Sequence, residues 1–183
     1  MTRLERTTTA LLVIDIQERL LPVIDGAADV EARSSVAIAG ARTLGVPVLA
    51  TEQYPKGLGH TVAPIAGQLG DLAPVPKVRF SCCGVDAVDA ELERLAPRTV
   101  LIAGIETHVC VMQTCLDLLE RSITPVILAD CVGSRHELDH RYALERLRAE
   151  GAVITTLEAA LFELTGEAGT DEFKAISKLV KPL

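Results

Sequence analysis

The sequence predicts an α/β protein with a doubly wound parallel sheet of about six strands in a three-layer α/β/α arrangement. Short apolar runs, typical of buried parallel strands, alternate along the chain with longer segments of helical periodicity. This alternation indicates one parallel sheet with helices on both faces. The 183 residues are 49% hydrophobic, which suits the core of a single domain over residues 1–183.

The strands are expected where the chain is apolar and β-branched. The first run is continuous and ends at Asp15 and Gln17, as expected for a strand that is buried on both faces. The expected strands are 8–16, 46–51, 75–78, 99–104, 125–130 and 152–155.

The helices are expected in the segments between these strands. The segment 27–44 is rich in alanine and ends at Gly45, and the segment 85–95 ends before Pro97. The expected helices are 27–44, 85–95, 108–121, 134–150, 156–164 and 171–178. Residues 52–74 are irregular, with one short helix expected at 64–69, and irregular segments of this length usually carry function.

Composition and charge exclude several classes of protein. The formal net charge of -7 argues against nucleic acid and anionic membrane as partners. No apolar run reaches transmembrane length, and the first residues do not have the layout of a signal peptide. We therefore expect a cytoplasmic protein that acts on a small molecule.

The cysteines predict reduced thiols. They are odd in number, two of them are adjacent, and none forms a CxxC pair. This pattern fits neither a disulfide framework nor a zinc site, so we expect no metal and no cofactor. The cysteines are residues 82, 83, 110, 115 and 131.

One stretch, residues 99–119, has the sequence of a strand, a sharp turn at Gly104 and a helix with Cys110 in its first turn. The partial positive charge of a helix N-terminus favours a thiolate, so Cys110 is a candidate nucleophile. Helical periodicity places Cys115 on the apolar face and Cys110 on the other face. An inert buried cysteine is the alternative for Cys110.

Two further residues are expected beside Cys110, because ligands bind outside the carboxyl ends of parallel strands. Asp15 ends the first strand and Lys77 ends the third. A carboxylate can accept the thiol proton, and an ammonium group lowers the thiol pKa and stabilises negative charge on a substrate. A structural Asp–Lys ion pair beside an idle thiol is the alternative.

The motifs VIDIQ, PVPKVRFS and GIETHVCVMQT, in this order and spacing, resemble the isochorismatase-like cysteine hydrolases, and TEQYPKGLGHT resembles a poorly characterised branch of that superfamily. The resemblance covers essentially the whole chain. It implies an Asp–Lys–Cys catalytic triad at Asp15, Lys77 and Cys110, and a cis peptide bond between Ile105 and Glu106. It also implies an oxyanion hole formed by the amides of Glu106 and Cys110, and a homo-oligomer, either a dimer or larger.

Departures from the family pattern narrow the expected activity. Metal-binding nicotinamidases have an Asp and two His after the second strand, where this chain has Glu52, Gln53 and Tyr54 and later His60. Tyr54 replaces a ligand, so we expect no metal site. Members that cleave the vinyl ether of isochorismate lack the nucleophilic cysteine, so Cys110 favours hydrolysis of a small amide or carbamoyl-type C–N bond through a thioester. A catalytically idle member that acts through binding or as a redox thiol is the alternative.

Residues near the strand ends are candidates for the substrate pocket. They are Gln17, Gln53, Tyr54, Phe80, Ile105 and Thr107. Phe80 fits a pocket wall and core packing equally, and Cys82 and Cys83 could line the pocket or be incidental. Arg135 could bind an anionic substrate or a neighbouring carboxylate. The substrate and the oligomeric state are not identified by the sequence.

Residues 136–140 match the HExxH signature of zinc proteases. Ser134 and Glu137 also form a capping box, which predicts a helix start instead. We expect the helix start, because no convincing third ligand follows.

Overall fold

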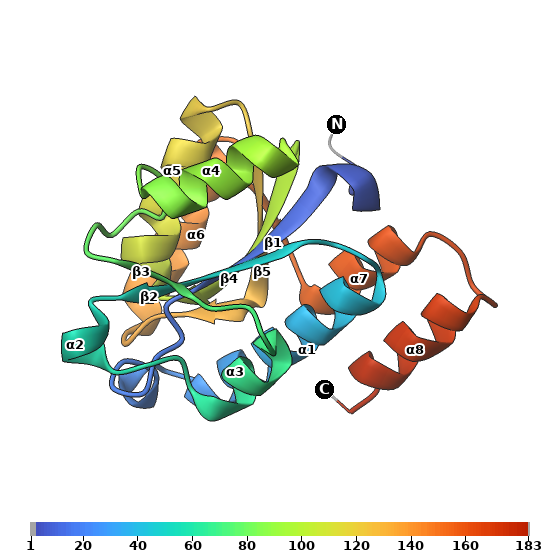
Figure 1. Ribbon diagram of the computed structural model, residues 1–183, viewed down its shortest axis with the longest axis horizontal. Helices are drawn as coiled ribbons and strands as arrows, with labels where there is room; N and C mark the ends of the chain where they lie inside the picture. The colour runs from blue at the N-terminus through green and yellow to red at the C-terminus, as the bar shows by residue number, and fades with distance from the viewer. Residues whose placement is uncertain (1–2, 183) are drawn as a thin grey trace.

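The computed structural model describes residues 3–182 and has a six-stranded, fully parallel sheet in the order β3-β2-β1-β4-β5-β6 (Figure 1). The predicted fold class is therefore confirmed. The strands are β1 (Thr9–Ile14), β2 (Val48–Gln53), β3 (Val75–Lys77), β4 (Thr99–Ile105), β5 (Thr124–Gly133) and β6 (Val153–Thr155). The strand order reverses between β1 and β4, and ligands of such sheets bind at that point.

The helices cover both faces of the sheet (Figure 1). The α-helices are α1 (Ala27–Thr43), α2 (Pro55–Leu58), α3 (Ala63–Leu69), α4 (Asp86–Leu95), α5 (Met112–Glu120), α6 (Glu137–Ala149), α7 (Leu157–Thr165) and α8 (Asp171–Val180). Short helical turns are η1 (Arg6–Thr8), η2 (Leu21–Val23) and η3 (Thr107–Val111), the last of which is π-helical.

Two apolar clusters form the core, one on each face of the sheet. Side chains on a strand alternate between faces, so Leu11 and Val13 of β1 pack with α1, α3, α7 and α8, whereas Leu12 and Ile14 pack with α4, α5 and α6. Four of the five cysteines belong to the second cluster. β1 and β4 are buried along their whole length, which explains their continuous apolar sequence.

The central strands approach each other closely at Gly104 of β4. Its φ is +128°, and a Cβ added there would overlap the main chain of Ile14 in β1. Only glycine fits this position. β1 ends directly after Ile14, because Asp15 has the left-handed φ of +56° and leaves the ladder.

Two expected helix starts are wrong. The helix expected from residue 108 begins with the π-helical turn η3, and regular α-helix starts only at Met112. The helix expected from Ser134 starts at Glu137, with His136 as an N-cap that makes no side-chain hydrogen bond. The capping box does not form because the Ser134 hydroxyl pairs with His108 Nδ1 at 3.0 Å. Within residues 3–182, no helix combines the length and apolarity needed to cross a membrane.

Candidate active site

Asp15 and Lys77 form a buried ion pair where β1 and β3 end. Lys77 Nζ donates to Asp15 Oδ2 at 2.6 Å, and neither side chain has exposed surface. The other carboxylate oxygen, Oδ1, accepts from Thr51 Oγ1 of β2 at 2.8 Å. Burial raises the pKa of the Asp15 carboxyl, although Lys77 and Thr51 both oppose that shift.

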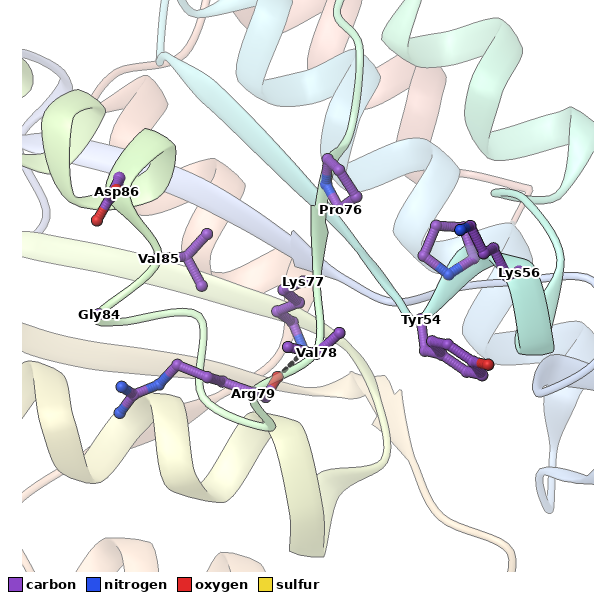
Figure 2. Close-up of a pocket in the computed structure, with 10 residues that line it drawn as sticks. Tyr54, Lys56, Pro76, Lys77, Val78, Arg79, Gly84, Val85 and Asp86 are labelled. Carbon is purple, nitrogen blue, oxygen red and sulfur yellow. Dashed lines mark hydrogen bonds between the residues drawn. The ribbon is translucent and has the colours of Figure 1, made fainter.

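Lys77 Nζ donates hydrogen bonds to four acceptors. Besides Asp15, its Nζ donates to Gln53 Oε1 at 2.7 Å and to the carbonyl oxygens of Phe80 at 2.9 Å and Arg79 at 3.2 Å. Figure 2 shows the Arg79 contact. Burial is the largest single influence on the Lys77 pKa and lowers it, but the charge and hydrogen bond of Asp15, together with the nearby Cys82 and Cys110, outweigh burial and raise the lysine pKa. The ammonium group is therefore fixed in position and protonated.

Cys110 lies in η3, directly beside this pair, with 4% of its surface exposed. Its Sγ is 4.0 Å from Gln53 Oε1, the outer limit of a thiol hydrogen bond. Burial and then the charge of Asp15 raise the pKa of the thiol, and Lys77 only partly offsets them. Lys77 lowers the thiol pKa as expected, but burial and the charge of Asp15 outweigh it, so the expectation of a net lowered pKa is wrong. The resting group is a neutral thiol.

Gln17 has a structural contact that the sequence did not indicate. Its side chain accepts from the Gln53 amide at 2.7 Å and donates to the Gln53 carbonyl at 3.0 Å and to the Gly59 carbonyl at 2.7 Å. Its polar atoms therefore bind main chain, which argues against Gln17 as a pocket residue. It fixes the end of β2 and with it the position of Gln53.

Cys82 adjoins the same cluster. Its Sγ is 3.6 Å from Thr51 Oγ1, the hydroxyl that donates to Asp15. Its amide donates to Thr114 Oγ1 at 2.9 Å, and that hydroxyl in turn donates to the Cys110 carbonyl at 2.6 Å. Burial raises the pKa of Cys82 to about 11. Cys82 therefore packs inside the site. Burial also raises the pKa of the neighbouring Cys83, to about 12.

The turn before Cys110 is hydrogen-bonded to residues 134–140. The Ile105–Glu106 peptide bond is cis. The Glu106 carboxylate accepts from the Arg135 amide at 2.9 Å and from Arg135 Nε at 3.1 Å. The Thr107 hydroxyl pairs with His140 Nδ1 at 2.9 Å. Arg135 thus binds a neighbouring carboxylate, and His140 of the HExxH match contacts the turn.

The pocket candidates separate into buried and exposed residues. Ile105 and Thr107 are fully buried, and Gln53 is 8% exposed. Phe80 is 52% exposed, so it is not a core residue, and it lines a cavity of about 300 Å³ with Ser81 and Gln113. Among residues 3–182, no group of three or more His, Cys, Asp or Glu side chains is arranged to hold a metal ion.

A larger cavity of about 530 Å³ lies along the outer edge of β3. Tyr54 and Lys56 stand on one side of the strand and Val85 and Asp86 on the other, as Figure 2 shows. It touches the candidate site only through Lys77, and neither Asp15 nor Cys110 lines it. Cys110 is thus separated from this cavity.

Known proteins are similar to this chain over nearly its whole length. A family model described as "Isochorismatase domain" matches residues 9–159. Isochorismatase domain-containing protein 1 of Salmo salar is 39% identical over 174 residues, which cover 95% of this chain and 61% of that protein. The secreted isochorismatase effector Isc1 of Phytophthora sojae is 40% identical over 191 residues, which cover 98% of this chain and 87% of that protein.

A solved structure, described as MAR1 ribonuclease from Caenorhabditis elegans, superposes with a TM-score of 0.92 at 37% identity and covers 98% of this chain and 92% of that one. The chain therefore spans about three fifths of the salmon protein and nearly all of the nematode one.

Proposed function

Because this chain belongs to the isochorismatase family, we propose that it is a hydrolase that cleaves a small amide or carbamoyl-type C–N bond through a thioester on Cys110. The buried Asp15–Lys77 pair beside the Cys110 thiol carries this proposal. A buried charge pair is costly unless its geometry is well satisfied, and here every charged atom has a partner. Such pairs cluster where proton transfer takes place.

The first half of the proposed reaction forms the thioester. Asp15 accepts the Cys110 proton as the sulfur attacks the carbonyl carbon of the substrate. Since the resting thiol is neutral, the proton moves during attack rather than before it. The negative charge that develops on the carbonyl oxygen is stabilised by the amides of Glu106 and Cys110, and the fixed charge of Lys77 lies nearby. Asp15 then returns the proton to the leaving nitrogen, which departs as an amine or ammonia.

The second half releases the acid. A water molecule gives a proton to Asp15 and attacks the thioester carbonyl. The tetrahedral intermediate collapses and breaks the C–S bond. The same proton passes from Asp15 to the sulfur, which restores the neutral thiol. Asp15 and Cys110 thus begin and end each cycle in the same protonation state.

The further roles that we propose concern partners and location. The substrate is a small molecule, because Cys110 is almost closed to solvent. The family resemblance supports a homo-oligomer, either a dimer or larger, and a cytoplasmic location is our expectation from the sequence. Light scattering of the purified chain tests the oligomer. A monomer at micromolar concentration would contradict it.

Two observations favour other functions, and the experiment below is designed to distinguish these from amide hydrolysis. The closed, neutral Cys110 is compatible with an idle binding or redox-thiol protein. The nematode structure at 37% identity is described as a ribonuclease. A net charge of -7 disfavours a polyanionic substrate, so we place RNA cleavage second to amide hydrolysis.

The experiment is turnover of a panel of small amides, carbamates and ureas, with RNA as a further substrate. Cys110→Ala and Cys110→Ser are compared with Cys115→Ala, which removes another buried thiol of the same apolar cluster. We expect both Cys110 variants to lose amide turnover and Cys115→Ala to keep it. Turnover that is unchanged in both Cys110 variants would refute the nucleophile, and RNA cleavage alone would favour the ribonuclease.

A further inference from the structure

Gln53, the last residue of β2, presents its side-chain carbonyl to two groups of the candidate site at once. Gln53 Oε1 accepts from Lys77 Nζ at 2.7 Å and lies 4.0 Å from Cys110 Sγ. Within residues 3–182, Lys77 Nζ has two side-chain acceptors, Asp15 and Gln53, and its other two acceptors are main-chain carbonyl oxygens of residues 79 and 80. Gln53 therefore links the ammonium group to the thiol.

The orientation of the Gln53 amide is determined by its partners. Its Nε2 donates to the Val78 carbonyl at 2.9 Å, so the oxygen must be the atom that faces Lys77. A reversed amide would point two donors at an ammonium group and leave a carbonyl against a carbonyl. The main chain of Gln53 is held at both its amide and its carbonyl by the Gln17 side chain. The acceptor is thus fixed from both ends.

The chemistry of this acceptor matters because of the charges around it. Asp15 and Lys77 neutralise each other, and the thiol is neutral. A carboxylate in place of Gln53 would add a second negative charge beside Cys110 and would compete with Asp15 for Lys77. The amide oxygen of Gln53 accepts the same hydrogen bond from Lys77 Nζ without adding charge.

We propose that Gln53 is a positioning residue of this site, whose neutral Oε1 orients Lys77 and the Cys110 thiol toward Asp15 without opposing the loss of the thiol proton. The role in catalysis rests on the proposed function, whereas the effect on Cys110 does not require a substrate. Gln53 therefore acts through Lys77 and Cys110, and it need not touch the substrate.

The test is the variant Gln53→Glu. The reactivity of Cys110 and the catalytic rate of this variant are each divided by the value for the native protein at the same pH, from pH 5 to pH 8. When ionised, the introduced carboxylate opposes the thiolate; when protonated, its carbonyl can accept from Lys77 while its hydroxyl donates to the Val78 carbonyl, as the amide does now. The other titratable groups facing this position are Asp15, Lys77, Cys110 and, through Thr51, Cys82. They are present in both proteins, so their own titration largely cancels in the ratio.

Two readouts are followed. The first is the rate at which iodoacetamide alkylates Cys110, read by mass spectrometry of its peptide; the second is kcat on any amide that the native protein hydrolyses. We expect both ratios to be about 0.1 or lower at pH 8 and to rise toward 1 as the pH falls to 5. Gln53→Met has a similar length but no acceptor, so its ratios should be low at every pH, with KM changed less than kcat.

The matched control is Gln68→Glu, an exposed glutamine of α3 whose ratios should stay near 1. Thermal unfolding verifies that each variant is folded. Ratios for Gln53→Glu that are flat with pH, or equal to those of the control, would overturn the proposal. If the native protein hydrolyses no amide, the proposed function fails, and the alkylation ratio still decides the role of Gln53.

Discussion

Replacing Lys77 by methionine should destabilise the protein strongly, because it leaves the Asp15 carboxylate buried without its counter-charge. Removing one partner of a buried ion pair typically costs about 3–5 kcal/mol. Thr51 Oγ1 would still donate to Asp15 Oδ1 at 2.8 Å, but a hydroxyl does not neutralise the charge of the carboxylate. We therefore expect a loss of free energy of unfolding within that range. With a urea m-value of about 2 kcal/mol/M, the unfolding midpoint at pH 7 should fall by about 1.5–2.5 M.

The controls for this prediction separate charge from volume. Lys56→Met removes an exposed lysine and should change the free energy of unfolding by at most about 0.5 kcal/mol. Adding Asp15→Asn to Lys77→Met should recover at least half of the loss. Lys77 lowers the pKa of Asp15, so its removal raises that pKa beyond its already raised value in the native protein, and the loss in Lys77→Met should shrink as the pH falls toward 4 and the carboxyl is protonated. A cost for Lys77→Met no larger than that for Lys56→Met would refute the reasoning.

Other predictions concern the thiols, the central strands and the turn before the nucleophile. Above pH 9 the free energy of unfolding should fall by about 1.4 kcal/mol per pH unit for each buried thiol, because the thiols ionise in the unfolded chain before they do in the folded one; Cys115→Ala should reduce this slope. Gly104→Ala should prevent accumulation of folded protein, since its Cβ overlaps main chain, whereas Gly67→Ala in α3 should be neutral or stabilising by thermal unfolding. Arg135→Ala should lower kcat about two- to fivefold by releasing Glu106, and an unchanged kcat would show that the turn holds its shape without this pair.

The fold and the convergence of the site follow from simple features of the sequence. Continuous apolar runs separated by helical segments allow only a parallel sheet with both faces covered. Asp15 and Lys77 lie at the ends of such runs, and the ends of parallel strands meet at one edge, so their proximity to Cys110 could be predicted without a structure.

The finer properties of the site depend on tertiary contacts that no local pattern encodes. The raised pKa of Cys110 follows first from its burial and then from the charge of Asp15, and neither the depth of burial nor the distance to Asp15 is encoded in the residues around Cys110. Ser134 has the spacing of a capping residue, but His108 from a distant segment takes its hydroxyl. The role of Gln53 is invisible in sequence because its two partners, Lys77 and Cys110, lie 24 and 57 residues away.

The central claim is that the substrate becomes covalently bound to Cys110. The most direct measurement is rapid acid quenching of the protein during turnover of an amide, or of an activated ester of the same acid, followed by mass spectrometry of its peptides. We expect an acyl group on the peptide that carries Cys110, released by hydroxylamine and absent from Cys110→Ala. Steady turnover with no adduct on Cys110, or with the acyl group on another residue, would contradict the account.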